Sequence, residues 1–385
     1  MTFKELSSKF NFTLPDYAES YFADFIAEYD RNIPVLSEKD AIIVADTTEL
    51  PEDGKSELIR CAKILNDSDD GHLCGSFLAC LTVYKRLPWV NYIYQTDLFT
   101  VEGLKAEQVG WILVATMLAN TLNNKKPPAD LNVENLTAFR NYSKNCLGTY
   151  GYWGITEWHW NMLCAGGCMF LFGILKFVPN HFTDRFFVIT DGKEYVSLTN
   201  NGYFIGKENE LLANEEGSVA KTYFYEDDKK FVANVVSRSG LIDVNTTEFD
   251  KSTWRMYLRA GSPTLAVHIP SNIAYTPENA RAAYKEAFEF YKNFYPEHET
   301  LAIDCSSWIL SPQLRKVLPE TSNILAIMDS GHLLPDFGSF TEDIMFIRKG
   351  TSMYNKIAEE RSKGTVFHIG IMYVPVDEID TFGLK

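Results

Sequence analysis

The sequence contains no long uninterrupted hydrophobic run. Its longest apolar segment, Met162–Val178, is interrupted by Lys176 and by several glycines, and it is too short for a helix that crosses a membrane. The first residues also lack the basic stretch and apolar core of a secretory signal. We therefore expect a cytoplasmic protein with no membrane partner.

Positive charge is scarce as well. Lysine and arginine together number 36, against 51 aspartate and glutamate residues, and the formal net charge is −15. Such a surface repels phosphate backbones and anionic lipid headgroups. The composition argues against nucleic acid as a partner and leaves an enzyme or a binding protein for small molecules.

The sequence also lacks the signs of a disulfide framework or a metal cluster. Its seven cysteines are an odd number scattered along the chain, which is typical of reduced thiols in a reducing compartment. Cys164 and Cys168 are four residues apart, but the small and apolar residues around them are typical of a tightly packed helix. We expect no metal.

Apolar residues, in contrast, are plentiful enough for two domains. The 385 residues are 46% hydrophobic and 14% aromatic, which is ample for packed cores. In the first part of the chain, apolar residues recur at helical spacing. The segments concerned are Asp16–Asp30, Lys55–Leu65, Leu73–Tyr84, Ala106–Leu122 and Val133–Cys146. We predict a helical N-terminal domain over residues 1–150.

A second domain is predicted over residues 151–385. A helix over Glu157–Leu175 is expected to join the two domains, and segments of β type separated by turn residues follow it. These predicted strands are Phe186–Thr190, Tyr195–Leu198, Tyr203–Ile205 and Lys230–Val236.

The last third of the chain alternates between strands and helices. Thr276-Pro277 supplies a capping residue and a first-turn proline for a helix that runs to Phe294, and Ser311-Pro312 starts another helix in the same way. Strands are predicted at Thr264–Ile269, Leu301–Asp304, Ile324–Met328, Ile344–Arg348 and Val366–Val374, with a helix at Met353–Ser362. The fold class is α+β, with a mixed, mostly antiparallel sheet and flanking helices.

Several separated motifs carry a family resemblance. They are Glu157-Trp158-His159-Trp160, the run from Trp254 to Gly261, Leu265-Ala266-Val267-His268-Ile269-Pro270, the helix from Thr276-Pro277 to Phe294-Tyr295-Pro296, Cys305–Leu314 and Leu318–Ile324. The sequence resembles a bacterial family of acyltransferases that pairs a helical N-acyltransferase N-terminal domain with a GNAT-like C-terminal domain. The detailed resemblance covers about residues 151–323.

The resemblance implies a sheet that splays between the strands at Thr264–Ile269 and Leu301–Asp304. In GNAT enzymes the pantetheine arm of acetyl-CoA or another acyl-CoA lies in this splay, and an amine attacks the thioester directly. Such chemistry needs a base, hydrogen-bond donors for the oxyanion and an acid for the departing thiolate. The resemblance therefore implies acyl-CoA as co-substrate and a small-molecule amine as acceptor.

One segment departs from the GNAT pattern. Most GNAT proteins carry a glycine-rich loop after the first of these strands, and its backbone amides hold the pyrophosphate of coenzyme A. Here Pro270–Tyr275 fills that place without any glycine. The amides of a helix N-terminus are an alternative phosphate site, although Pro277 removes one donor.

His268 and Cys305 each stand at the C-terminal end of a predicted strand, where functional residues of open α/β sheets often lie. A shared cavity would allow a Cys–His nucleophile pair with an acyl-enzyme intermediate. The alternative is a buried histidine that bonds to backbone and a small apolar cysteine.

Further candidates for cofactor binding lie around the same strand ends. Ser306, Ser307 and Trp308 offer hydroxyls and backbone amides to a thioester or phosphate, or else they shape the turn and pack on the sheet. Pro270 follows the first strand. Asn323 is expected to start the next strand and to tie neighbouring loops together.

Glu157 and His159 are the candidates for the catalytic base. They occupy the first turn of the predicted junction helix and are flanked by Trp158 and Trp160, whose rings would remove water from an ionisable pair. Helix capping and packing between the domains is the alternative reading.

Three hypotheses follow from these observations. The first is an acyltransferase that moves a group other than an amino-acyl group from acyl-CoA to an amine. The second is a hydrolase or transferase that depends on Cys305 and His268. The third is a protein that binds acyl-CoA or another metabolite without turnover.

Overall fold

The computed structural model describes residues 1–14, 18–81, 98–124, 133–166, 169–270, 273–344 and 347–384. They form two compact units, Met1–Phe170 and Leu171–Lys385, each described here by itself. Several predicted features lie wholly or partly outside the described residues. These are the start of the helix predicted over Asp16–Asp30 and the end of the helix predicted over Leu73–Tyr84. Cys168, Ser271 and Asn272 also lie outside the described residues.

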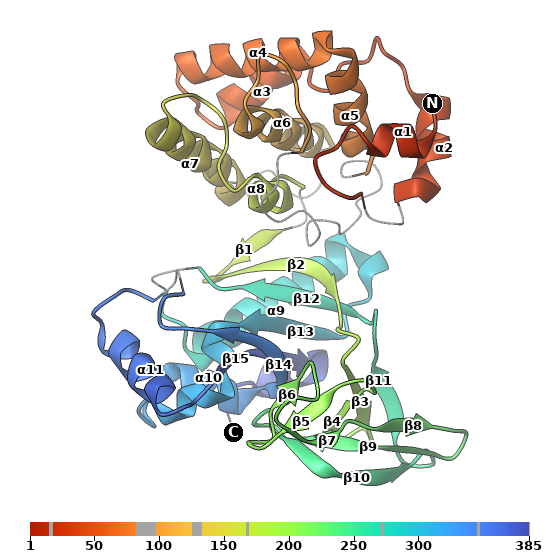
Figure 1. Cartoon of the computed structure of the whole chain (residues 1–385), viewed down its shortest axis with the longest axis vertical. Coiled ribbons are helices and arrows are strands. Elements are labelled where there is room, and N and C mark those ends of the chain that lie inside the picture. The colour runs from red at the N-terminus through yellow and green to blue at the C-terminus, as the bar shows by residue number, and fades with distance from the viewer. Residues whose placement is uncertain are drawn as a thin grey trace. The chain divides into compact units, whose positions relative to one another are not determined.

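The first unit is helical, as predicted (Figure 1). Its helices are α1 (Phe3–Ser7), α2 (Ala18–Glu28), α3 (Glu38–Thr47), α4 (Glu52–Asp67), α5 (Asp69–Ala79), α6 (Ala106–Asn124), α7 (Val133–Tyr150) and α8 (Trp158–Ala165). Helix α4 illustrates why they form, because its buried residues Leu58, Cys61, Ala62 and Leu65 lie on one stripe. In the described ranges, no helix has the length and apolar composition needed to cross a membrane.

The predicted junction helix over Glu157–Leu175 is wrong in its second half. Helix α8 ends at Ala165, and the chain continues as strands β1 (Phe170–Phe172) and β2 (Leu175–His181). Gly173 has a φ of 53°, a left-handed conformation that suits the turn between the strands. The aromatic and β-branched residues on both sides favour strands over a continued helix.

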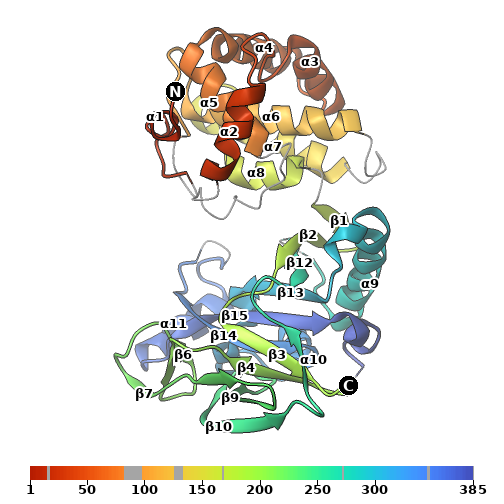
Figure 2. The same ribbon diagram turned by 90° about the vertical axis from the view of Figure 1, so that its right-hand side faces the viewer.

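The second unit contains a six-stranded sheet in the order β1-β2-β12-β13-β15-β14 (Figure 2). The remaining strands of this sheet are β12 (Pro263–His268), β13 (Ala302–Ser307), β14 (His332–Phe340) and β15 (Phe367–Pro375). Strands β12 and β13 are parallel, whereas β2–β12, β13–β15 and β14–β15 are antiparallel pairs. This mixed, mostly antiparallel sheet confirms the predicted α+β class.

A second sheet has the order β10-β9-β4-β3-β11, with β8 also paired to β9, and a small third sheet has the order β6-β5-β7. The second sheet consists of β3 (Phe186–Thr190), β4 (Tyr195–Thr199), β8 (Phe224–Glu226), β9 (Lys230–Val236), β10 (Ile242–Asp250) and β11 (Arg255–Leu258). The third consists of β5 (Phe204–Gly206), β6 (Leu211–Leu212) and β7 (Ser218–Lys221).

The helices of this unit are α9 (Pro277–Phe294), α10 (Asn323–Ser330) and α11 (Ser352–Ser362), with 3-10 turns η4 (Pro296–His298), η5 (Trp308–Leu310), η6 (Pro312–Lys316) and η7 (Val376–Thr381). Three predictions fail here. The predicted strand at Ile324–Met328 is helix α10, and Ile344, Ile347 and Arg348 form no strand in the described part of that segment. The helix expected after Ser311 is only the short turn η6.

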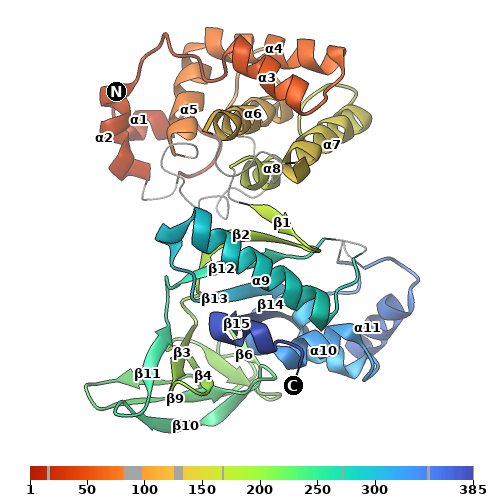
Figure 3. The same cartoon turned by 180° about the vertical axis from the view of Figure 1, so that it is seen from behind.

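The two faces of the six-stranded sheet are covered differently. Helix α9 packs on the face that carries Phe177, since the Phe177 and Tyr284 rings are 6.0 Å apart and the Tyr291 hydroxyl donates to the Phe177 carbonyl at 2.6 Å. Figure 3 shows α9 in front of these strands. The opposite face packs on the second sheet, where Ala302 and Tyr373 share a buried cluster with strand β3 and its neighbours.

Candidate functional site

Strands β12 and β13 begin side by side and then part. Their parallel register runs through three pairs, Thr264–Ala302, Leu265–Ile303 and Ala266–Asp304. Beyond that point β12 continues beside β2, where Val267 and His268 pair with Phe177 and Lys176. Strand β13 instead follows β15. We call the gap beyond Ala266 and Asp304 the strand opening.

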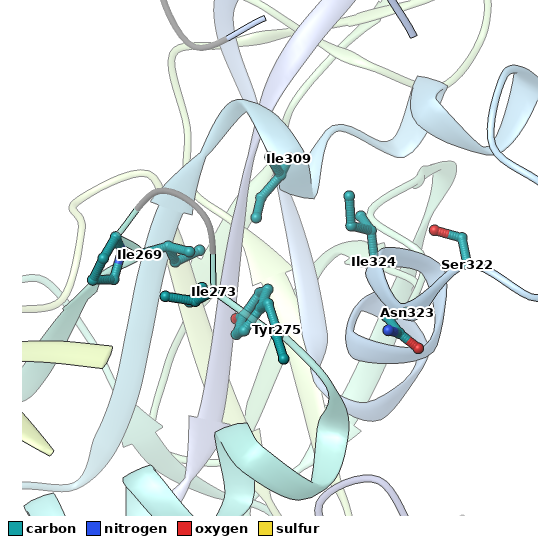
Figure 4. A pocket seen from close by; sticks show the side chains of 9 residues that line it. Ile269, Ile273, Tyr275, Ile309, Ser322, Asn323 and Ile324 are labelled. Carbon is teal, nitrogen blue, oxygen red and sulfur yellow. The ribbon is translucent and has the colours of Figure 1, made fainter. Parts of the chain in front are cut away.

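A cavity lies at the outer end of this opening. It has a volume of about 400 Å³, and Figure 4 shows side chains from the loop after β12, from η5 and from the start of α10 around it. Its lining residues are Ile269, Pro270, Ile273, Ala274, Tyr275, Ile309, Ser322, Asn323 and Ile324. We call it the end pocket.

The end pocket is mainly apolar, with its polar groups gathered at one helix. Isoleucines from three segments form much of the lining. On the other side stands the first turn of α10, whose N-cap residue Ser322 makes no side-chain capping bond. The first turn of α9 differs, because the Thr276 hydroxyl accepts a hydrogen bond from the Asn279 amide there.

The pairing register also decides which side chains share a face around the opening. Residues paired across neighbouring strands point to the same side of a sheet, and residues one position apart point to opposite sides. Asp304 therefore shares a face with Ala266, and His268, two residues further along β12, lies on that face too. Cys305 lies on the other face, which α9 covers.

A family model describing a GNAT-like C-terminal domain matches residues 169–364, just over half of the chain. The chain belongs to this family. Among curated proteins, the comparison found no match.

Solved structures resemble the whole chain in fold. An acyltransferase mutant in complex with octanoyl-CoA shares 14% identity, covers 94% of this chain and 96% of its own, and gives a TM-score of 0.55. An acyltransferase in complex with decanoyl-CoA and teicoplanin has the same identity and coverage, with a TM-score of 0.54. An acyltransferase with decanoyl-CoA covers 97% and 99% of the two chains at 15% identity, with a TM-score of 0.53.

Cys305 is deeply buried in the GNAT-like domain. It is 2% exposed, and its thiol donates a hydrogen bond to the Val267 carbonyl at 3.5 Å across the beginning of the opening. Burial raises the pKa of the thiol far above its usual value, and the nearby Asp304 carboxyl adds to this effect. A thiolate is the nucleophilic form of cysteine, so this environment disfavours nucleophilic attack.

His268 does not join Cys305, because the two side chains point to opposite faces of the sheet. His268 is partly exposed. Burial and, to a smaller extent, the positive charge of Lys176 together lower its pKa to about 4, so the imidazole is neutral at neutral pH. The geometry does not support the Cys305–His268 nucleophile pair that the sequence allowed.

Asp304 is a residue that the sequence interpretation left without a role. It belongs to the last pair before the strands part, and the Asn180 side-chain amide donates to its two carboxylate oxygens at 3.4 and 3.2 Å. Burial raises its pKa to about 6, while Thr264 and Asn180 oppose this shift. A charged residue inside an apolar strand segment is the sequence signal that could have found it.

The three residues after Cys305 have different surroundings. Ser306 is exposed, whereas the Ser307 hydroxyl accepts a hydrogen bond from the Ile309 amide at 3.4 Å and so caps η5. The Trp308 ring packs edge-on against Phe340 at 5.8 Å, within a cluster beneath α11. Trp308 and Ser307 thus shape the turn that presents Ile309 to the end pocket.

Pro270 and Asn323 both line the end pocket, although Asn323 starts helix α10 and not the strand that the sequence predicted. Sequence reasoning missed Tyr275, Ile309 and Ser322. An Asn-Ile-Leu-Ala-Ile run suits a strand as well as a helix, so the first turn of α10 was not recognised.

Glu157 and His159 lie in the first unit. Glu157 is exposed and is the N-cap residue of α8, with a φ of 50° and no side-chain capping bond. Left-handed backbone is uncommon for residues other than glycine and often occurs at functional sites. Glu49, Asn209 and Glu299 also have positive φ. The His159 side chain lies outside the described part. Among the described residues, no group of three or more potential ligands is placed to hold a metal.

Proposed function

We propose that the protein is an acyltransferase that moves an acyl group from acyl-CoA to an amine of a small molecule by direct attack. The parting of β12 and β13 beyond Ala266 and Asp304, inside a GNAT-like domain, carries this proposal. Backbone groups that face a strand opening have lost their partner across the sheet and are available to the amide groups of a pantetheine arm.

The end pocket supports the same proposal. It lies at the end of the opening and combines an apolar lining with Ser322 and Asn323 at the start of α10. Structures of similar fold hold octanoyl-CoA or decanoyl-CoA, and one also holds teicoplanin. These ligands indicate the donors to test first on this chain.

The reaction balances without a metal or redox partner. The neutral amine nitrogen attacks the thioester carbonyl, the carbon–nitrogen bond forms, and the carbon–sulfur bond breaks. The acceptor ammonium loses two protons in total, of which the departing thiolate takes one and solvent receives the other through a base. The products are an amide and free coenzyme A.

Several predicted site residues keep proposed roles. Pro270 and Asn323 are proposed to contact the donor, and Ser306 to bond near the thioester. Ser307 and Trp308 are proposed to hold the turn that presents Ile309. Glu157 and His159 stay proposed catalytic residues.

Binding and release measurements test the proposal directly. Isothermal titration with acetyl-, octanoyl- and decanoyl-CoA is expected to give binding to at least one donor. A panel of primary amines is then expected to release free thiol and form an amide. Binding without thiol release would indicate a non-catalytic binding protein, and no binding to any donor would overturn the proposal.

A variant that fills the end pocket tests whether the acyl-CoA donor binds there. Ala274→Phe adds a ring to an exposed residue that lines the end pocket, and we expect affinity for the donor to fall by roughly 10-fold or more. The matched control is Ala282→Phe, which places the same ring at an exposed position of α9 that does not line the pocket. Equal affinities of the two variants would place the donor elsewhere.

A further inference from the structure

Asp304 occupies the point where the sheet divides. On one side it pairs with Ala266, and on the other with Tyr373 of β15. Its own strand continues to Ser306 on the same face, at the edge of the strand opening. The carboxylate therefore stands beside the gap in which a thioester would lie.

The Asp304 carboxylate accepts hydrogen bonds from a side-chain amide, but it has no ion-pair partner among the described residues. Asn180 donates to both of its oxygens. In the part of the chain that the structure describes, no lysine, arginine or histidine forms an ion pair with Asp304. Buried carboxylates are usually paired with a cation. A positively charged ligand group would supply the missing partner.

The strand neighbours of Asp304 on this face do not neutralise its charge. The methyl side chain of Ala266 cannot form a hydrogen bond, and the Tyr373 hydroxyl is bonded to the Ser197 hydroxyl at 2.8 Å. Asp304 is nevertheless partly exposed, so solvent and a ligand can reach it. Other titratable groups on this face include Lys176 of β2, His268 of β12 and Tyr373 of β15. His332 of β14 pairs with Tyr373, and its ring nitrogen is 2.8 Å from a carboxylate oxygen of Glu378.

Asp304 lies on the face of the sheet opposite to Cys305 and to the side of the end pocket that Tyr275 lines. Tyr275 lines the end pocket and lies close enough to Cys305 for the two to interact electrostatically, and Cys305 is on the face that α9 covers. Asp304 points to the opposite side of the same sheet. An acceptor near Asp304 would therefore approach the opening from the side opposite to the donor.

We propose that Asp304, oriented by Asn180, binds the ammonium group of the acceptor and takes the proton that this group must lose before attack. This proposal rests on the proposed function and names its acceptor class as primary amines that are charged at neutral pH. Asp304 is the catalytic residue in this scheme, and Asn180 is a positioning residue.

The chemistry of the step is balanced. The ammonium transfers one proton to the Asp304 carboxylate and becomes a neutral amine, which attacks the thioester carbonyl. As the carbon–sulfur bond breaks, the protonated carboxyl returns its proton to the thiolate, and the second proton of the former ammonium passes to solvent. A carboxyl with a pKa of about 6 suits this exchange near neutral pH, because it is ionised yet still basic enough to accept a proton.

The test uses the full chain with decanoyl-CoA as donor and hexylamine as acceptor probe. Asp304→Asn is expected to bind decanoyl-CoA like the unchanged protein, but to lose at least roughly 100-fold in kcat/KM for amide formation. Asp329→Asn is the matched control, since Asp329 is exposed at the far end of α10. Its activity is expected to stay unchanged.

A second readout separates this proposal from the proposed function. Hexylamine binding, followed by titration calorimetry, is expected to weaken at least 10-fold in Asp304→Asn, and hexanol is expected not to bind either protein. If decanoyl-CoA does not bind the unchanged protein, the proposed function fails while the amine measurement still decides on Asp304. Equal hexylamine affinity in both proteins would overturn the ammonium site.

The pH profile distinguishes a base from a structural residue. The acid limb of kcat/KM is expected near pH 6, and Asn180→Ala is expected to move it upward, because the Asn180 amide stabilises the ionised carboxylate. This variant also decides the case if Asp304→Asn fails to fold. An acid limb that Asn180→Ala leaves in place would contradict the role of Asp304.

Discussion

A carboxyl group that is largely removed from water and has no cationic partner costs folding free energy, and Asp304 is such a group in the described part of the chain. Its pKa of about 6 lies above that of an unfolded chain, so the folded protein binds the proton more tightly than the unfolded one. The contribution of Asp304 to the free energy of unfolding is therefore most favourable at low pH, and it falls as the pH rises from about 4 through 6. This loss of stability is consistent with the proposed role of Asp304 in binding the ammonium group of the acceptor.

Asp304→Asn is accordingly predicted to stabilise the protein at neutral pH while it removes activity. The gain in the free energy of unfolding is expected to be positive and at most about 3 kcal/mol, at about 1.4 kcal/mol per pKa unit, and to vanish below about pH 4. Urea unfolding at both pH values measures it. A variant less stable than the unchanged protein at pH 7 would contradict the pKa assignment.

Cys305 is predicted to react with iodoacetamide more slowly than Cys80. Its thiol is buried, hydrogen-bonded and raised in pKa, whereas Cys80 is partly exposed. Iodoacetamide followed by peptide mass mapping is expected to label Cys80 well before Cys305. Rapid labelling of Cys305 in the folded protein would revive a cysteine-dependent mechanism.

The elements of the second unit show what local sequence decides. Helix α9 begins at Pro277 and ends at Phe294 as predicted, because Thr276 caps it and its apolar residues keep one periodicity throughout. Strands β3 and β9 also match their predicted bounds. Helix α10 was mistaken for a strand, since a short apolar run fits both periodicities until its packing partners are known.

Turn η5 is an element on which the end pocket depends, and Gly370 of β15 makes room for it. A methyl group added at Gly370 would lie 1.9 Å from the Leu310 carbonyl oxygen, which is backbone and cannot move aside cheaply. Gly370→Ala is predicted to displace η5 and Ile309, to destabilise the unit by about 1–3 kcal/mol and to weaken donor binding.

The control for Gly370→Ala is Gly338→Ala in the neighbouring strand β14. There the added methyl group would lie 3.2 Å from the end of the Ile369 side chain, which can rotate away. Thermal unfolding and decanoyl-CoA titration of both variants provide the comparison. Similar behaviour of the two would mean that the tight contact with η5 is unimportant.

At the scale of the whole molecule, composition and motifs pointed to two parts and to the GNAT-like family, and the family match confirms the second point. The site itself was harder to predict. The sequence placed His268 and Cys305 at neighbouring strand ends, but only the register reveals that they point to opposite faces. One residue of shift reverses that relation, so local patterns cannot supply it.

The net charge of −15 gives a prediction for donor binding. Among the described residues that line the end pocket there is no lysine or arginine, so backbone amides and not ion pairs are expected to meet the phosphates. Raising the salt concentration from about 20 to about 200 mM is expected to leave decanoyl-CoA affinity unchanged or to increase it, because salt screens the repulsion between the acidic protein and the anionic donor. A loss of affinity in salt would indicate a basic phosphate site.

In the proposed scheme, the donor and the acceptor reach the strand opening from opposite sides of the sheet. The donor and the acceptor then do not compete for one binding site, and each can bind while the other is present. The expected kinetics are sequential, with intersecting double-reciprocal plots and no burst of coenzyme A before an amine is added.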